Sequence, residues 1–317
     1  MMDSNESRRE TGWEKELLER LAFASLQEQK TRRRWGIFFK SIGFIYLIVL
    51  AVVLSGVAGG ASHSKQKHTA LVDLRGVIDT DGDNSAESVN AALNDAFKEE
   101  NAQGIILRIN SPGGSPVQSG IIYDEIKRLR EKHPEKPLHV VVEDVCASGG
   151  YFIAAAADRI YVNRASIIGS IGVLMDGFGF SGSMDKLGVE RRLLTAGENK
   201  GFLDPFSPQD PRHKKHAQIL LDDIHKQFID VVRKGRGNRL RETPEMFSGL
   251  MWTGQQSVAL GLVDEFGTVD SVARDVIKAE TVVDYTLHRS LTDRLAQRFG
   301  TSMGAAVASS FRNWRIF

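Results

Sequence analysis

The feature that most constrains this sequence is an uncharged, apolar stretch near its amino terminus. Residues 41–64 contain no Asp, Glu, Lys or Arg, and residues 42–54 are almost entirely hydrocarbon. A helix needs about 20 such residues to cross the roughly 30 Å hydrocarbon core of a bilayer. A buried helix of this length in a soluble protein usually keeps a polar face, which this stretch lacks. The sequence therefore predicts a transmembrane helix over residues 41–61.

The charges that flank this span predict its orientation. Arginines at 32–34 and Lys40 precede it, whereas Lys65 and Lys67 follow it, so the positive-inside rule places residues 1–40 in the cytoplasm as a charged segment. A cleaved signal peptide is the alternative, because the small residues at 57–61 would suit a peptidase. The apolar run is longer than the 7–15 residues usual for a signal peptide. We therefore expect an uncleaved anchor, followed by a tether at residues 62–68.

Composition excludes several classes of protein. Lys and Arg total 41 against 40 for Asp and Glu, so no basic excess indicates a nucleic-acid partner. The single cysteine, Cys146, excludes an intrachain disulfide and any site built from several cysteines. The sequence has no His-Glu-x-x-His motif and no phosphate-binding loop, so we expect neither a metal nor a cofactor.

Beyond the tether, patterns typical of strands alternate with patterns typical of helices. This interleaving favours an α/β domain with a parallel sheet over residues 69–281. Residues 282–317 have weak periodicity and are expected to form a C-terminal tail, either a peripheral helix or a mobile segment. The predicted strands are 69–78, 104–110, 138–143 and 159–163, and the predicted helices are 85–100, 118–132, 147–157 and 217–232.

Two glycine-rich turns, 110–115 and 146–150, follow predicted strands, and ligands of α/β sheets bind at the carboxyl ends of strands. The second turn places Ser148 at the start of a helix, where free backbone N–H groups favour an anion. Acyl transfer needs a hydroxyl nucleophile and two donors for the oxyanion. Ser148 fits the nucleophile, with the Gly149 N–H as one donor and Gly113 or Gly114 supplying the other. The alternative is that Ser148 merely caps the helix, and spacing alone favours that role.

A serine nucleophile also needs a base. Lys200 lies in a loop, 195–206, among small and apolar residues. Lysine acts as a base only when neutral, so burial would have to lower its pKa by about three units from about 10.4. The alternative is an ordinary exposed loop lysine. The other candidates are histidines in an apolar strand or in charged helical stretches, namely His133, His139, His213, His216 and His225.

Short motifs follow one another in order from about residue 70 to residue 275. Their ordered series resembles the bacterial signal peptide peptidase A family in its short, single-repeat form, which implies a Clp protease/crotonase-like fold after one transmembrane helix. The motifs are 108–115 (RINSPGGS), 147–151 (ASGGY), 168–173 (IGSIGV), 186–189 (KLGV), 197–201 (GENKG), 252–254 (WTG) and 259–264 (ALGLVD).

The resemblance implies a serine endopeptidase with a Ser/Lys dyad. By motif, Ser148 corresponds to the nucleophile and Lys200 to the general base, while the Ser170 hydroxyl bonds the lysine amine. Gly114 and Gly149 correspond to the oxyanion donors. Ser/Lys pairs are a recognised variant of the catalytic triad.

The resemblance also implies a setting for the enzyme. The expected substrates are hydrophobic peptides, including signal peptides left in the membrane, and the expected assembly is a homo-oligomeric ring whose subunits share each dyad. The expected location is the bacterial cytoplasmic membrane, with the catalytic domain outside the cytoplasm, in the periplasm if the cell is Gram-negative.

Three other functions compete with this interpretation. A crotonase-type acyl-CoA enzyme would use the same oxyanion hole without a serine nucleophile, and the anchor and the Ser148/Lys200 pair disfavour it. A membrane scaffold without catalysis would not need Ser148. A histidine-based Clp-like protease lacks an evident base.

Overall fold

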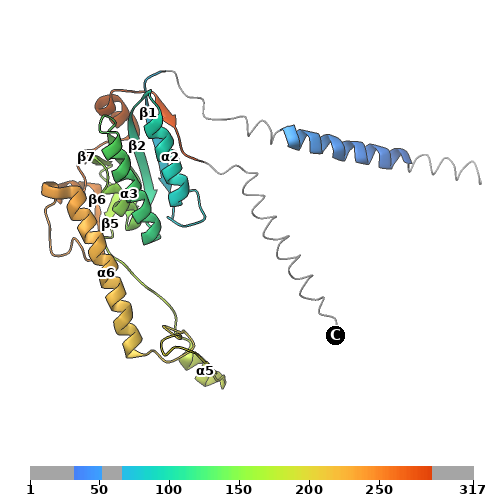
Figure 1. The fold of residues 1–317 in the computed structure, drawn as a ribbon, viewed down its shortest axis with the longest axis vertical. Coiled ribbons are helices and arrows are strands. Elements are labelled where there is room, and N and C mark those ends of the chain that lie inside the picture. The colour runs from blue at the N-terminus through green and yellow to red at the C-terminus, as the bar shows by residue number, and fades with distance from the viewer. Residues whose placement is uncertain (1–31, 52–65, 288–317) are drawn as a thin grey trace, which may run out of the picture. The chain divides into compact units, whose positions relative to one another are not determined.

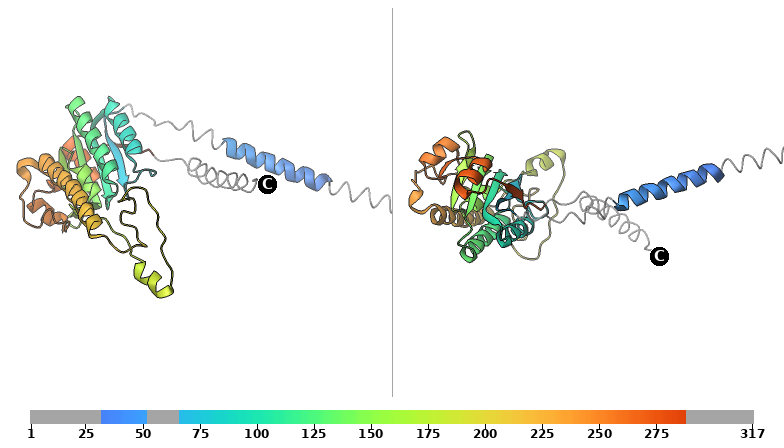
Figure 2. Two further views of the ribbon diagram at one scale, coloured as in Figure 1. Left: turned by 60° about the horizontal axis from the view of Figure 1, so that its bottom comes forward. Right: turned by 90° about the horizontal axis from the view of Figure 1, so that it is seen from above.

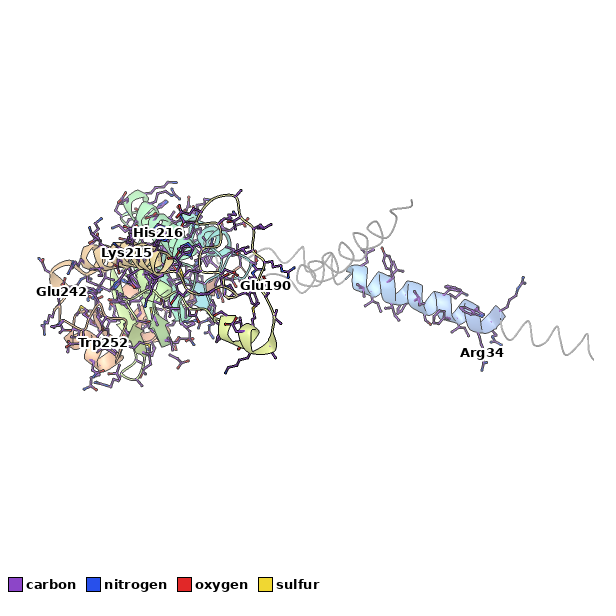
Figure 3. The ribbon with its side chains drawn as sticks, turned by 90° about the horizontal axis from the view of Figure 1, so that it is seen from below. Arg34, Glu190, Lys215, His216, Glu242 and Trp252 are labelled. Atoms are coloured by element: carbon purple, nitrogen blue, oxygen red, sulfur yellow. The ribbon has the colours of Figure 1, made fainter. Side chains whose placement is uncertain are left out.

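The computed structural model describes residues 32–51 and 66–287. The first range is a single helix, Arg32–Ala51, which is long and apolar enough to cross a membrane by length and composition. Figure 3 shows the side chains of this helix, with Arg34 labelled. The predicted span began at residue 41, whereas the helix already includes residues 32–40. Residues 52–61 of that span lie outside the described residues, as do 1–31 and most of the predicted tether.

Residues 66–287 belong to a separate compact unit in which strands and helices alternate. This arrangement confirms the predicted α/β class (Figure 1). The elements are β1 (His68–Arg75), α2 (Ala86–Lys98), β2 (Ala102–Ser111), α3 (Pro116–Lys132), β3 (Leu138–Ala147), α4 (Gly149–Ala154), β4 (Arg159–Val162), β5 (Ile167–Gly169), α5 (Ser181–Leu187), α6 (Pro211–Arg236), η1 (Gly237–Arg239), β6 (Met251–Thr253), α7 (Gly254–Ala259), β7 (Glu265–Phe266), α8 (Val269–Ser271), η2 (Val272–Ile277) and β8 (Val282–Asp284).

One sheet organises this unit. Its main path runs β6-β5-β3-β2-β1-β8, with β4 and β7 branching from β3. All pairs are parallel except β5 with β6. Parallel strands buried on both faces read as continuous apolar runs, which is why the sequence pattern revealed the central ones.

The two faces of the sheet follow from the alternation of side chains along each strand. In β2, Ile105 and Leu107 pack into the core shared with α2 and α3. Ile106, between them, joins a second core with Val272 and Ile277 of η2. Helices α2 and α3 thus cover one face and η2 the other, so the sheet has a fixed register beneath the site.

Strand β3 leads directly to the site because it changes partners along its length. Its first half pairs with β4 and its second half, Val145 to Ala147, pairs with β5. The predicted helix over 147–157 was therefore too long, since Ala147 still belongs to the strand and α4 covers only Gly149–Ala154.

The carboxyl-terminal boundary of the domain also differs from the expectation. Strand β8 pairs in parallel with β1, and Tyr285 behind it is buried, with its hydroxyl 3.0 Å from His68 Nε2. Residues 282–284 therefore form an edge strand of the sheet rather than part of a tail, and Val283 and Tyr285 pack against its core. Residues 288–317 lie outside the described residues.

A buried ion pair fixes α6 to the region before β7. Arg236 is 1% exposed and donates from Nη1 and Nη2 to the two carboxylate oxygens of Asp264, each at 2.9 Å. Its Nε donates to the Gly261 carbonyl at 2.9 Å, and Asp264 also accepts from the Ile160 N–H at 2.7 Å. Burial raises the pKa of Asp264, but the hydrogen bonds and charge of Arg236 outweigh it and hold that pKa below its ordinary value.

Replacing this carboxylate should destabilise the domain strongly. We expect Asp264→Ala to lower the free energy of unfolding by about 3–5 kcal/mol, because it leaves a buried guanidinium without a counter-charge. Since the folded pKa is depressed, the stabilisation is present above the ordinary value of 3.8 and is lost as the pH falls through the folded value. Denaturant unfolding at neutral pH and below pH 4 measures both effects. Asp275→Ala, in the exposed Arg274–Asp275 pair, is the control and should change little; an equal loss from both variants contradicts the prediction.

Candidate active site

Ser148 occupies a sharp turn between β3 and α4. It is half-buried with φ 51° and ψ −124°, a backbone conformation that costs energy for a non-glycine residue. The turn is held by the Ser148 N–H donating to the Gly169 carbonyl and by the Phe152 N–H donating to the Ser148 carbonyl, both at 2.9 Å. Ser148 stands at the capping position of α4 but makes no side-chain capping hydrogen bond. The helix-cap alternative is therefore wrong, and the hydroxyl is available for chemistry.

Two backbone N–H groups of the glycine-rich turns line the same cleft as Ser148. Neither the Gly149 nor the Gly114 N–H has a hydrogen-bond partner in the part of the chain that the structure describes. A Cβ placed on Gly149 would lie 3.3 Å from Gly114 N, so the two turns are in contact. The Gly113 N–H already donates to Ser111 Oγ at 3.1 Å. Of the two donors left open by the sequence, the geometry favours Gly114 over Gly113.

The turn that carries Gly114 requires glycine. Gly114 has φ +154°, and a Cβ there would lie 2.1 Å from the Ile78 carbonyl oxygen. Ile78 holds the turn on both sides, since its N–H donates to Gly113 O at 2.9 Å and its carbonyl accepts from the Ser115 N–H at 2.8 Å. The position of the Gly114 N–H therefore depends on the close approach of two backbones.

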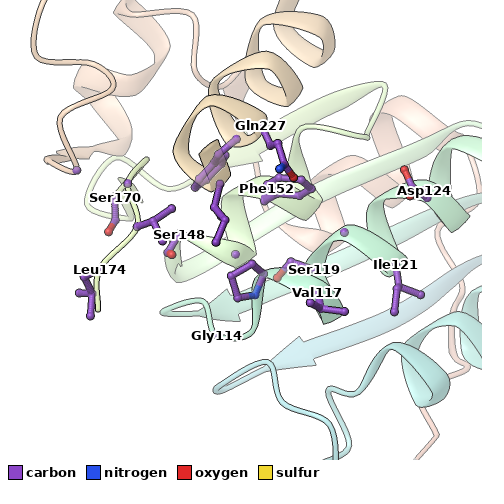
Figure 4. Close-up of a pocket in the computed structure, with 18 of the residues that line it drawn as sticks. Gly114, Val117, Ser119, Ile121, Asp124, Ser148, Phe152, Ser170, Leu174 and Gln227 are labelled. Carbon is purple, nitrogen blue, oxygen red and sulfur yellow. The ribbon is translucent and has the colours of Figure 1, made fainter. Parts of the chain in front are cut away.

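Ser148 opens into a cleft of about 770 Å³. Helices α3 and α6 contribute its walls, and Phe152 of α4 lies between them (Figure 4). Most of the lining side chains are apolar or small, a composition typical of sites that bind apolar ligands. The lining residues are Gly114, Pro116, Val117, Ser119, Gly120, Ile121, Asp124, Ser148, Gly149, Phe152, Ser170, Gly172, Val173, Leu174, Ile224, Gln227, Phe228, Ser248 and Gly249.

Ser170 lines the same end of the cleft as Ser148 (Figure 4). It also has a left-handed backbone, φ 50°, and its N–H donates to the Leu250 carbonyl at 2.8 Å. The antiparallel pairing of β6 with β5 brings residue 250 to this position. The structure thus gathers four of the five predicted site residues: Ser148, Ser170, Gly114 and Gly149.

Lys200 is the exception. It does not line the cleft, and it is exposed in the loop after α5, where its N–H donates to the Gly197 carbonyl at 3.1 Å. Figures 1 and 2 show α5 and the segments around it reaching away from the sheet, beyond the amino-terminal end of α6. The Lys200 amine is therefore not part of the cleft of its own chain.

Comparisons with known proteins agree with this geometry. The model of peptidase family S49 matches residues 130–283, and the Clp protease model matches residues 62–172. The putative protease MJ0651 of Methanocaldococcus jannaschii is 31% identical over 225 residues, which cover 68% of this chain and 71% of that protein. The chain belongs to peptidase family S49. The S49 match spans Ser148, Ser170 and Lys200, and the Clp match covers both glycine-rich turns.

Two further relatives differ in how much of their own length the match covers. The putative signal peptide peptidase SppA of Enterococcus faecium is 29% identical over 236 residues, covering 72% of this chain and 67% of that protein. A protein of Brucella abortus named Na(+)/H(+) antiporter NhaA is 44% identical over 209 residues. The match covers 64% of this chain but only 28% of that relative, so most of the antiporter lies outside it. The S49 family name, and not the antiporter name, describes the shared segment.

Among residues 32–51 and 66–287, no histidine lines the S49 cleft. His225 Nε2 lies 3.1 Å from the Ile171 carbonyl, and His139 is buried against Tyr161, where burial lowers its pKa. Cys146 is also buried, which raises the pKa of its thiol. Across residues 32–51 and 66–287, no group of three or more His, Cys, Asp or Glu side chains could hold a metal ion.

The walls of the cleft were not predicted from the sequence. The pattern of residues 118–132 predicted a helix but not which of its side chains face a ligand, and Ile121 is 46% exposed and lines the cleft with Val117 and Asp124. Val117, Ile121 and Asp124 are spaced by four and three residues, which places them on one face of α3. The opposite wall of the cleft comes from α6, about 100 residues further along the sequence. Only the fold brings these two helices together.

Proposed function

We propose that this S49 protein is a serine endopeptidase that uses Ser148 as its nucleophile. One observation carries the proposal: Ser148, whose hydroxyl does not cap α4, lines an apolar cleft together with Gly114 and Gly149, whose N–H groups have no hydrogen-bond partner among the described residues. A hydroxyl with two backbone donors is the arrangement that acyl transfer requires.

The proposed mechanism needs a neutral lysine amine. Lys200 takes the proton from Ser148 Oγ as that oxygen attacks the peptide carbonyl, and the N–H groups of Gly114 and Gly149 stabilise the resulting oxyanion. The C–N bond then breaks, and the protonated lysine gives its proton to the leaving amine. Water, deprotonated by the same lysine, then attacks the acyl-enzyme. The ester C–O bond breaks, the lysine returns its proton to Ser148 Oγ, and the carboxylic acid product leaves. Ser170 accepts or donates a hydrogen bond to hold the amine in place.

A second copy of this chain is the proposed source of the lysine, since Lys200 lies outside the cleft of its own chain. The segment that carries it exposes apolar side chains, including Phe178 at 81% and Leu194 at 97%. Exposed apolar patches of this kind mark interaction surfaces. A head-to-tail ring, in which each copy inserts this segment beside the next cleft, would bury the patch and complete every dyad.

The proposed substrates are hydrophobic peptides, including signal peptides that remain in the membrane. The apolar cleft supports this class, and the Enterococcus faecium relative is named a putative signal peptide peptidase. The helix Arg32–Ala51 would anchor the enzyme in the bacterial cytoplasmic membrane with its amino terminus inside and the catalytic domain outside. Such an anchor would keep the site close to peptides released within the bilayer.

Covalent labelling tests the nucleophile directly. Full-length protein in detergent is treated with a fluorophosphonate, and the modified residue is located by mass spectrometry. We expect one adduct, on Ser148, and none in Ser148→Ala. An assembled, folded protein that is never labelled would favour the crotonase-type or scaffold alternatives, because neither needs an activated serine.

A further inference from the structure

The cleft changes in chemical character along its length. Ser148 and Ser170 lie at one end, and Asp124 lies at the other, on the far side of Val117 and Ile121 (Figure 4). Among the described residues that line the cleft, Asp124 is the only one with an ionisable side chain. An apolar cleft with one carboxylate discriminates between ligands by charge at that point.

No cation among the described residues forms an ion pair with Asp124. Its carboxylate is exposed and makes no ion pair or hydrogen bond with the described residues. Arg128, one turn further along α3, is instead bound to Glu125, with Nη2 donating to Oε1 at 2.6 Å. Burial raises the pKa of the neighbouring Tyr123, and the negative charge of Asp124 raises it further. The carboxylate is therefore available to a ligand.

The surface between Ser148 and Asp124 is apolar. Val117 and Ile121 of α3 face Ile224 and Phe228 of α6, and the Phe152 ring lies 5.2 Å from the Phe228 ring. A lysine or arginine side chain can lay its methylene groups along such a wall and place its charged end at a carboxylate. A peptide with apolar residues near the scissile bond and a basic residue beyond them would match both ends.

We propose that Asp124 is a specificity-determining residue that binds a basic side chain of the peptide substrate. The inference rests on the proposed peptidase function and narrows its substrate class to apolar peptides that carry a lysine or arginine at one fixed distance from the cleaved bond. Asp124 touches the substrate but takes no part in bond breaking.

Matched peptides test this subsite. A fluorogenic series shares one apolar segment and carries a single Lys or Gln at successive positions on either side of the cleavage site. For full-length protein in detergent, we expect one position at which the kcat/KM ratio of Lys to Gln peptide is about fivefold, the order of a partly exposed ion pair. Asp124→Asn should bring that ratio close to one, and Asp124→Lys should favour the corresponding Glu peptide. Higher ionic strength should reduce the wild-type ratio.

A matched control separates this role from a general charge effect. Asp95→Asn removes an exposed mid-helix carboxylate from α2, outside the cleft, and should leave the ratio at its wild-type value. The proposed subsite is contradicted if Asp124→Asn, like Asp95→Asn, leaves the kcat/KM ratio of Lys to Gln peptide unchanged. It is also contradicted if the wild-type protein prefers Lys over Gln at no position of the peptide. If wild type cleaves no peptide, the peptidase proposal fails. The subsite is then judged by binding, since labelled Lys peptides should still bind more tightly than Gln peptides, and equal binding overturns it.

Discussion

Ser148→Ala is expected to abolish peptide hydrolysis, lowering kcat by at least about 10³-fold. The residual rate would come from the two N–H donors and from binding, which remain when the nucleophile is lost. Truncating the hydroxyl removes no capping hydrogen bond from α4, and Ser148 Oγ has no other hydrogen bond with the described residues. The loss should therefore appear in kcat, with little change in KM or in the thermal midpoint. Initial rates on a fluorogenic apolar peptide, with size measured by light scattering, provide the comparison.

Ser88→Ala is the matched control for this variant. Ser88 lies on α2, outside the cleft, and its hydroxyl bonds that of Ser85 at 3.1 Å. We expect its activity to stay near the wild-type value. A folded and assembled Ser148→Ala protein that hydrolyses the peptide at the wild-type rate would exclude Ser148 as the nucleophile. Loss of activity together with loss of assembly would be decided by the labelling result on the wild-type protein.

The central sheet was predictable because local signals agree with the fold there. Residues 104–110 and 138–143 are apolar runs that become β2 and β3, and both end in glycine-rich turns. In a parallel sheet, neighbouring strands end at the same edge, so these turns had to meet. The residue spacing alone left Gly113 and Gly114 open, and only the family resemblance indicated Gly114. The absence of a capping hydrogen bond from Ser148 was not predictable from the sequence, because it depends on how the turn is held in the folded chain.

Long-range pairings account for most of what the sequence did not show. Strand β6 has only three residues, too few for the alternation that predicts a strand, yet its antiparallel pairing with β5 sets the position of Ser170. Arg236 reads as one charged residue among several at the end of α6, but the fold buries it against Asp264. The loop around Lys200 was recognised by its motif. The Lys200 side chain is exposed in its own chain, so the burial expected of a lysine base is not present there.

Lys200→Ala should reduce kcat by about 10²–10⁴-fold, the contribution typical of a general base. The location of this lysine outside its own cleft adds a sharper expectation for mixed assemblies. Ser148→Ala and Lys200→Ala chains are co-expressed at equal levels. A site that draws its serine and its lysine from two copies is then intact when the serine comes from a Lys200→Ala chain and the lysine comes from a Ser148→Ala chain. Random assembly of a head-to-tail ring then restores about a quarter of the wild-type activity.

The mixed assembly distinguishes a shared dyad from one within a single chain. If each chain supplied its own lysine, every site in the mixture would carry one defect and activity would stay at the level of the single variants. Lys186→Ala is the control, because Lys186 is an exposed lysine on α5 of the same segment and should retain wild-type activity. Equal losses in Lys186→Ala and Lys200→Ala would mean that the segment acts through assembly rather than through a base. Restoration in the mixture, with full activity in Lys186→Ala, would assign the Lys200 amine to the neighbouring Ser148.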